Sequence, residues 1–311
     1  MKVVVIGGGG FIGINLCEAL VSQGHAVRVF DRTRAKHTFP SNIARQVEWF
    51  EGDFLNSNEV SEALRGCEVV FHLVSTTLPK SSNENPAYDA ESNIVASIQM
   101  LEAAKCLGVR KVVFNSSGGT VYGIPEKVPI PETHKTDPLC AYGIGKLAIE
   151  KYLALFHYRN GLDYIILRMS NPYGPYQQPC ADQGAIAVFL NKALNGDTIE
   201  IWGDGSVTRD FIYISDAVDA LVQMLYYEGP ERIFNVGSGE GHSLNDILDL
   251  MEAVLGYHIK RRYMQGRALD VPINLLDISR IQNELGWEPK TPLMDGMRCT
   301  LNYLRKSCKI K

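Results

Sequence analysis

A tyrosine and a lysine four residues apart are the first pair in this chain that suggests chemistry. They stand in the segment Tyr142-Gly143-Ile144-Gly145-Lys146. At this spacing two side chains lie one above the other on the same face of a helix. A phenol with a pKa of about 10 is a poor base at neutral pH, but a neighbouring ammonium stabilises the phenolate. Such a base beside a hydride acceptor would dehydrogenate an alcohol, although the same spacing also occurs in ordinary surface pairs.

Two hydroxyl residues lie upstream of this pair. Ser117 and Thr120 follow the apolar run Val112–Asn115, which is typical of a strand. Ligands of open α/β sheets bind outside the carboxyl ends of the strands. We therefore expect Ser117 or Thr120 to bond a substrate oxygen and orient it toward Tyr142, although adjacent serines alone are also typical of a turn.

Three glycines follow the first apolar run of the chain. Gly7, Gly10 and Gly13 come directly after Lys2–Ile6 and open a helix predicted over Phe11–Gln23. Glycine permits a tight turn, close approach of the backbone to a pyrophosphate, and close helix–strand packing. The N–H groups of the first helical turn, which includes Phe11 and Ile12, then face the phosphates. The segment therefore predicts a dinucleotide site.

Acidic residues at the ends of the next strands refine this prediction. Asp31 lies 18 positions after the last of the three glycines, where a carboxylate accepts hydrogen bonds from the adenosine ribose and repels a 2′-phosphate. It favours NAD over NADP, whereas Arg32 and Arg34 weaken that preference. Asp53 is expected either to reach the adenine amine or to act as an ordinary carboxylate at a helix N-terminus. The positive ring of NAD⁺ would further favour a phenolate at Tyr142.

Strands and helices alternate through the first 170 residues. This alternation predicts a doubly wound, parallel Rossmann sheet of the α/β class. We expect residues 1–170 to form the NAD-binding domain, with the sheet completed by about 213–237, and residues 171–311 to form a smaller α/β lobe. Strands are predicted at Lys2–Ile6, Ala26–Phe30, Val47–Phe50, Val69–Val74, Val112–Asn115, Tyr164–Leu167 and Ile233–Val236. Helices are predicted at Phe11–Gln23, Ser57–Arg65, Pro86–Leu107, Leu139–Tyr158, Gly184–Leu194, Asp216–Tyr226 and Met294–Arg305, and a loop at Asn171–Asp182.

Composition excludes several classes of protein. The chain has 311 residues and a formal net charge of −4, which argues against a generic nucleic-acid binder. Its apolar runs are too short for a signal peptide or a membrane span, so we expect a cytoplasmic protein. Seven scattered cysteines, with no CxxC pair and no zinc spacing, argue against disulfides and a metal.

Taken together, these segments resemble a known family across essentially the whole chain. They are Gly7-x-x-Gly10-Phe11-Ile12-Gly13, Asp31, Gly52-Asp53-Phe54, His72-Leu73, Ser116-Ser117, Val121-Tyr122-Gly123, Tyr142-x-x-x-Lys146, Asn171-Pro172-Tyr173-Gly174-Pro175, Trp202-Gly203-Asp204-Gly205, Arg209-Asp210-Phe211-Ile212-Tyr213 and Leu285-Gly286-Trp287-x-Pro289. The combination resembles the extended short-chain dehydrogenase/reductases, the NAD-dependent epimerase/dehydratase family. Within that family it is most similar to nucleotide-sugar 4-epimerases, in particular those that act on UDP-glucose.

The resemblance implies roles for individual residues. Tyr142 would be the base, Lys146 its partner, and Ser117 or Thr120 the hydroxyl that contacts the sugar. The position four before Tyr122, where many members carry that hydroxyl, is Gly118 here. The remaining implied contacts are with the cofactor at Asp53, Phe54 and Leu73, and with the nucleotide diphosphate and its ribose at Asn171, Arg209, Arg267 and Asp270.

The activity implied is the interconversion of UDP-glucose and UDP-galactose, or of their N-acetyl forms, through a 4-keto intermediate with bound NAD, in a homodimer. A nucleotide-sugar 4-ketoreductase is the main alternative, and Asp31 argues against its usual NADPH. A 4,6-dehydratase would carry an Asp-Glu pair where this chain has Gly118-Gly119. A non-catalytic NAD-binding scaffold would not need Tyr142 and Lys146.

Overall fold

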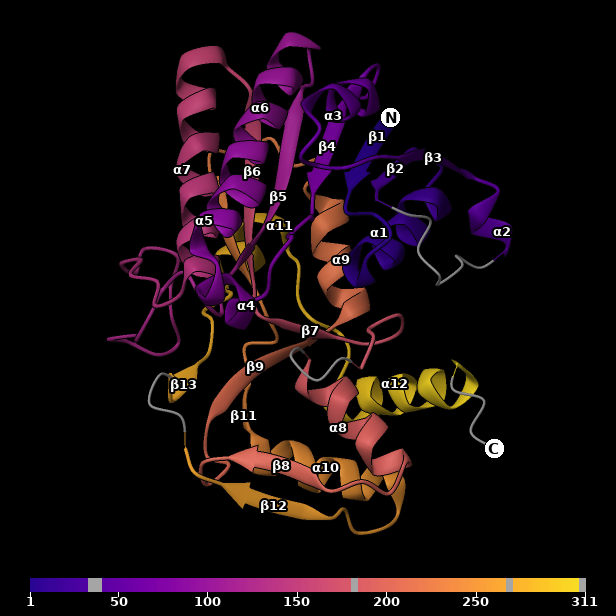
Figure 1. Cartoon of the computed structure of the whole chain (residues 1–311), viewed down its shortest axis with the longest axis vertical. Helices are drawn as coiled ribbons and strands as arrows, with labels where there is room; N and C mark the ends of the chain where they lie inside the picture. The colour runs from indigo at the N-terminus through magenta and orange to yellow at the C-terminus, as the bar shows by residue number, and fades with distance from the viewer. Residues whose placement is uncertain (33–40, 180–183, 267–270, 308–311) are drawn as a thin grey trace.

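A seven-stranded, fully parallel sheet forms the centre of the larger domain (Figure 1). The computed structural model describes residues 1–32, 41–179, 184–266 and 271–307. The strand order is β10-β6-β5-β4-β1-β2-β3, which confirms the predicted Rossmann class. The strands are β1 (Lys2–Ile6), β2 (Ala26–Asp31), β3 (Val47–Glu51), β4 (Val69–His72), β5 (Lys111–Ser117), β6 (Asp163–Met169) and β10 (Ile233–Val236).

Helices cover both faces of this sheet, because its central strands are apolar on both sides. On one face α1 (Phe11–Ser22) packs beside α9 (Ile214–Gln223), and buried residues of both helices belong to the same core cluster. On the other face lie α3 (Ser57–Leu64), α6 (Ala96–Cys106) and α7 (Ala141–Asn160), which bury a second cluster against the sheet. Because all seven strands are parallel, their carboxyl ends lie at the same edge of the sheet, between the two helix layers.

The helix predicted as one element over Pro86–Leu107 is interrupted. It consists of α5 (Pro86–Asp89), a π-helical turn η1 (Ala90–Val95), and α6. A π turn adds one residue to a helical turn, and such turns often occur at functional sites. A short helix, α4 (Pro79–Glu84), precedes it and was not predicted, because its sequence PKSSNE has no apolar periodicity.

The smaller lobe is built from short strands that pair over long sequence distances. Its first sheet contains β9 (Thr208–Tyr213) between β11 (Gly241–Ser243) and β13 (Ile273–Asn274). The fourth strand, β7 (Asn171–Tyr173), also pairs with β9 and lies inside the segment predicted as a loop, so that prediction was wrong there. The other elements outside the main sheet are α2 (Ser41–Ala44), α8 (Ala185–Leu194), β8 (Ile199–Trp202), α10 (Leu244–Leu255), β12 (Arg261–Met264), α11 (Ser279–Leu285) and α12 (Leu293–Ser307).

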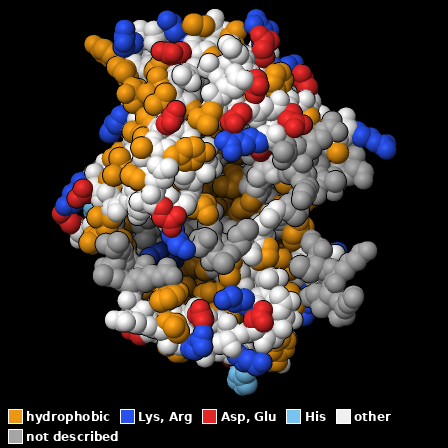
Figure 2. All heavy atoms as spheres, viewed as in Figure 1, with side chains coloured by type: hydrophobic (Ala, Val, Ile, Leu, Met, Phe, Trp, Pro, Cys, Tyr) orange, Lys and Arg blue, Asp and Glu red, His pale blue; other side chains and the backbone are white. Residues whose placement is uncertain are grey.

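The surface between the sheet domain and the lobe is hollowed on the face that Figure 2 shows, and hydrophobic side chains line its floor. β7 and β9 cross from one part to the other in this region (Figure 1). Within the described residues, no helix has the length and apolar character needed to span a membrane.

Candidate active site

The glycine turn between β1 and α1 is shaped by close backbone contacts. A Cβ at Gly7, whose φ is +82°, would lie 2.9 Å from the backbone nitrogen of Val74. A Cβ at Gly13 would lie 2.4 Å from the carbonyl oxygen of Gly7. Gly10 is the N-cap of α1 and has no side chain to cover the amides of Phe11 and Ile12. The turn therefore leaves a backbone cradle that fits a pyrophosphate.

Asp31 fixes the next part of this cradle. It ends β2, and its Oδ2 accepts a hydrogen bond of 2.9 Å from the backbone N–H of Gly9. Burial raises the pKa of the Asp31 carboxyl. The Arg32 guanidinium lies 3.2 Å from Asp53 Oδ1, so its charge is paired with Asp53. This pairing agrees with a site for an unphosphorylated ribose, while Arg34 lies outside the described residues.

Phe54 and Leu73 lie close to this cradle in different ways. The Phe54 side chain is buried in the core, with its ring centroid 5.3 Å from that of His72. Leu73 follows β4, and its N–H donates a 3.0 Å hydrogen bond to the carbonyl of Ile6. Its carbonyl carbon would lie 3.2 Å from a Cβ at Gly7. Leu73 thus borders the cradle through its backbone, whereas the Phe54 side chain packs in the core beside His72.

Tyr142 and Lys146 lie on the first turns of α7, which α4 holds in place. The backbone N–H of Tyr142 donates to Ser82 Oγ at 3.0 Å, and that of Ala141 donates to Asn83 Oδ1 at 2.9 Å. The Lys146 side chain is buried, and its Nζ donates a 2.9 Å hydrogen bond to the carbonyl of Asn115 at the end of β5. The two predicted catalytic residues therefore meet the carboxyl edge of the sheet.

The electrostatic state of this pair follows from burial. Burial, with smaller contributions from Cys140 and Asp89, raises the pKa of Tyr142 to about 12. Burial also lowers the pKa of Lys146 to about 8. The Lys146 Nζ is 5.6 Å from the centroid of the Tyr142 ring. A further positive charge near Tyr142, such as an oxidised nicotinamide, is the factor that would favour its phenolate.

The two candidate hydroxyls occupy the loop after β5. Ser117 is the last residue of β5, and Thr120 lies against α7, because a Cβ at Gly143 would be 3.2 Å from the Thr120 Cβ. Thr120 Oγ1 is buried and has no hydrogen-bond partner within the described residues. A Cβ at Gly118 would lie only 2.6 Å from Leu276 Cδ1 and 3.0 Å from the carbonyl oxygen of Arg168, so a serine or threonine there would require Leu276 to shift. Ser117 and Thr120 both remain candidates for the catalytic hydroxyl.

Two predicted substrate residues lie side by side in the lobe. Asn171 Nδ2 donates to the carbonyl of Asp210 at 2.8 Å, next to Arg209 on β9. One nitrogen of the Arg209 guanidinium donates to the carbonyl of Val271 at 2.7 Å. The structure therefore places Asn171 and Arg209 on one strand pair. Arg267 and Asp270 lie outside the described residues.

Sequence analysis missed two polar residues that line a small cavity together with Tyr142. Asp89 and Asn93, on α5 and η1, line a small cavity together with Val74, Ser75, Tyr142, Gly145, Lys146 and Ile149. The available signal was an aspartate and an asparagine four residues apart in the segment predicted as one long helix. The π turn itself, which follows Asp89 and contains Asn93, has no such signal in the sequence.

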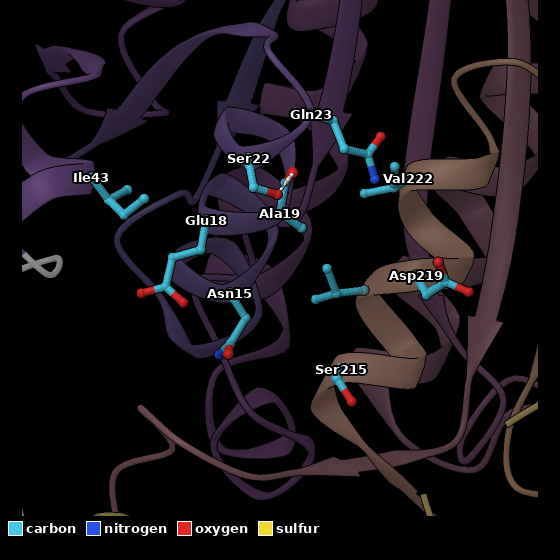
Figure 3. A pocket seen from close by; sticks show the side chains of 10 residues that line it. Asn15, Glu18, Ala19, Ser22, Gln23, Ile43, Ser215, Asp219 and Val222 are labelled. Carbon is cyan, nitrogen blue, oxygen red and sulfur yellow. Dashed lines mark hydrogen bonds between the residues drawn. The ribbon is translucent and has the colours of Figure 1, made fainter. Parts of the chain in front are cut away.

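A separate groove of about 550 Å³ lies between α1 and α9 (Figure 3). Asn15 and Glu18 of α1 and Ser215 and Asp219 of α9 are among the residues that line it (Figure 3). It contains none of the predicted catalytic residues. The chemistry is therefore expected at the carboxyl edge of the sheet and not in this groove.

The glycine cradle, Asp31 and the parallel sheet are the features of a dinucleotide-binding Rossmann domain. A model of the NAD dependent epimerase/dehydratase family matches residues 3–237. The chain belongs to this family, and its cofactor is NAD.

Three similar proteins cover nearly the whole chain. The UDP-glucose 4-epimerase of Mycolicibacterium smegmatis is 34% identical over 311 residues, which are 98% of this chain and 99% of the relative. The dTDP-4-dehydro-6-deoxyglucose reductase of Escherichia coli is 33% identical over 317 residues, 99% and 98% of the two chains. The crystal structure of UDP-glucose 4-epimerase with UDP-glucose from Thermotoga maritima has a TM-score of 0.92 at 35% identity and 99% coverage of both chains.

Proposed function

We propose that this protein is an NAD-dependent nucleotide-sugar 4-epimerase that interconverts UDP-glucose and UDP-galactose or their N-acetyl forms. The observation that carries the proposal is that the buried Lys146, bonded to the carbonyl of Asn115 near the end of β5, has its Nζ 5.6 Å from the centroid of the Tyr142 ring. Val74, which borders the glycine turn at Gly7, lines the same small cavity as this pair. The similarity to UDP-glucose 4-epimerases supports the choice of reaction.

In this proposal Tyr142 removes the proton of the sugar 4-hydroxyl and later returns it. The Lys146 ammonium stabilises the Tyr142 phenolate, and the carbonyl of Asn115 holds that ammonium in place. A hydroxyl of Ser117 or Thr120 donates to the sugar oxygen and orients it. When bound, NAD supplies the reversible acceptance of a hydride from the sugar. Proton and hydride both return, so no cofactor is consumed.

Inversion requires the nucleotide to stay bound while the keto sugar turns. Arg209 is suited to hold the diphosphate, because a guanidinium binds phosphate through a planar fork. Asn171, on the paired strand, is proposed to bond near the phosphates. Arg267 and Asp270 are assigned to the diphosphate and ribose from the resemblance alone. In this arrangement the lobe holds the nucleotide and the sheet domain carries the chemistry.

We also propose a homodimer formed through α7 and the helix of η1 and α6. Exposed apolar side chains on these elements include Val95, Ile144, Leu155 and Tyr158. Light scattering after size exclusion is expected to give twice the chain mass, and Leu155→Arg is expected to shift it to one chain. A wild-type mass of 34.5 kDa would exclude the dimer.

A 4-ketoreductase is the second candidate, because the E. coli reductase is as similar as the epimerases. A reductase would consume reduced cofactor with a 4-keto-6-deoxy nucleotide sugar. The pairing of Arg32 with Asp53 argues against the usual NADPH of such enzymes. Net oxidation of added NADH or NADPH by this substrate would favour the reductase.

The test is to incubate the purified protein with UDP-galactose, and in parallel with UDP-N-acetylgalactosamine, without added reduced cofactor. The C4 epimer is expected from at least one of them with wild type and not with Tyr142→Phe. Absence of both epimers in a preparation that contains bound NAD would contradict the proposal.

A further inference from the structure

Asp89 is a buried carboxylate behind the catalytic pair to which the proposed reaction gives no role. It is the last residue of α5, directly before the π turn, and only 3% of its surface is exposed. Its Oδ1 accepts hydrogen bonds from Thr77 Oγ1 and, at 3.1 Å, from Asn93 Nδ2. These two bonds fix the orientation of the carboxylate.

The other oxygen of Asp89 is aimed at α7. Asp89 Oδ2 lies 3.3 Å from the position of a Cβ at Gly145. Gly145 stands directly before Lys146 and three residues after Tyr142, and all three residues line the same small cavity as Asp89. A side chain at position 145 would crowd the carboxylate, so this glycine permits the close approach.

Lys146 requires a negative charge in its surroundings. Its side chain is buried, and the hydrogen bond of its Nζ goes to a neutral carbonyl, that of Asn115. A buried ammonium is costly unless it is compensated. Glu150, one turn further along α7, is bound by Arg168 at 2.7 Å and by Ser116 Oγ at 2.5 Å. Its charge is therefore already balanced.

Charged groups on the other elements around Asp89 do not offer the same compensation. Lys80 and Glu84 of α4 and Glu91 of η1 are exposed to solvent. On β4, burial keeps His72 neutral, because it lowers the pKa of that imidazole to about 3. Cys140 is the N-cap residue of α7, and its electrostatic effect is on Tyr142, whose pKa it raises. Among the described residues, Asp89 is thus the buried carboxylate that lines the same cavity as Lys146. Within that part of the chain it has no arginine or lysine partner of its own.

We propose that Asp89 is a positioning residue: its carboxylate is the counter-charge of the Lys146 ammonium and keeps that lysine protonated beside Tyr142. The inference rests on the proposed function only for the role of Lys146. The pKa directions agree, since burial lowers the pKa of Lys146 and the charges of Asp89 and Glu150 raise it. Asp89 also raises the pKa of Tyr142, so its removal is expected to lower both values.

The first test measures the protonation of Lys146 itself. Asp89→Asn removes the charge and keeps an oxygen that accepts from Thr77 and Asn93. Acetic anhydride labelling of Lys146 across a pH series, followed by peptide mass spectrometry, gives the pKa of its amine. The pKa is expected to fall by about one unit in Asp89→Asn and to stay unchanged in the matched control Glu91→Gln. An unchanged pKa in Asp89→Asn would overturn the proposal.

The second test is a double-mutant cycle in urea unfolding. If the two charges compensate each other, Asp89→Asn combined with Lys146→Met is expected to destabilise less than the sum of the two single substitutions. If Asp89→Asn alone does not fold, the double variant is expected to fold. Additive effects, or failure of the double variant as well, would show that Asp89 acts only through Thr77 and Asn93.

Both readouts are independent of turnover. A protein without activity on any nucleotide sugar would contradict the proposed function and leave these measurements interpretable. A normal epimerase with an unchanged Lys146 pKa in Asp89→Asn would contradict only the role of Asp89.

Discussion

Two successive turns of α7 carry buried charges, and their surroundings differ. On the first, Lys146 donates to the carbonyl of Asn115 and faces a cavity. On the second, Glu150 binds the Arg168 guanidinium through both oxygens, at 3.1 and 2.7 Å. The Lys146 ammonium can therefore still form interactions with a bound substrate and cofactor. The Glu150 carboxylate has its partners within the protein and stabilises the fold. Proximity to the site alone therefore does not separate catalytic from structural charges, but hydrogen-bond partners do.

The largest expected effect is a loss of activity, at the Tyr142–Lys146 pair of α7. Tyr142→Phe removes the proposed base and is expected to lower kcat about 10³-fold, the usual contribution of a general base. Its free energy of unfolding is expected to change by less than about 1 kcal/mol, as for most substitutions that break no structural bond. Steady-state kinetics and urea unfolding measure the two quantities. Retained activity would remove Tyr142 from the catalytic role.

Substitutions at the Glu150–Arg168 pair are expected to lower the stability of the fold. Arg168→Met leaves Glu150 buried without its partner and is expected to cost about 3–5 kcal/mol of unfolding free energy. Adding Glu150→Gln removes the uncompensated charge and is expected to recover part of that loss. Urea unfolding of the single and double variants measures this. A loss below about 1 kcal/mol for Arg168→Met would show that the two turns do not differ as described.

The buried His72 is expected to make the free energy of unfolding depend on pH, an effect of intermediate size. Burial lowers its pKa to about 3, so the unfolded chain binds a proton below about pH 6.5 that the folded chain does not. Stability is therefore lost as the pH falls. Between pH 7 and pH 5 the unfolding free energy of wild type is expected to drop by about 2 kcal/mol more than that of His72→Gln. Equal losses in both proteins would contradict a neutral buried imidazole.

The smallest effect concerns the loop after β5. The buried Thr120 hydroxyl has no partner within the described residues, so Thr120→Val is expected to raise the unfolding free energy by up to about 1 kcal/mol. Comparing its kcat with that of Ser117→Ala identifies the catalytic hydroxyl, which is the residue whose variant loses more activity. A clear loss of stability in Thr120→Val would indicate a structural hydrogen bond.

Much of the candidate site was predictable from the sequence, because its signals are local. The Gly7–Gly13 spacing, Asp31 at a strand end and the four-residue spacing of Tyr142 and Lys146 all depend on neighbours along the chain. In the structure the glycine turn follows β1, Asp31 ends β2, and Lys146 donates to the carbonyl of Asn115 near the end of β5, so these segments lie at the carboxyl edge of the sheet.

The rest depends on contacts between distant residues. Ser82 accepts a hydrogen bond from the N–H of Tyr142 across 60 positions of sequence, and the Leu276 side chain packs against Gly118. The pairing of β7 with β9 joins segments about 40 residues apart, which is why Asn171–Tyr173 was predicted as loop. The close approach of Asp89 to Gly145 likewise has no local pattern in the sequence. Such features arise from tertiary packing, which periodicity does not encode.

The central claim is that the C4 hydrogen of the sugar leaves and returns to the same carbon. The most direct measurement incubates the protein with UDP-galactose, and in parallel with UDP-N-acetylgalactosamine, each carrying deuterium at C4, without added reduced cofactor, and analyses the products by NMR and mass spectrometry. The account predicts, from at least one of the two substrates, a C4 epimer that keeps the deuterium at C4. An epimer that has lost the deuterium, or no epimer from either substrate, would contradict it.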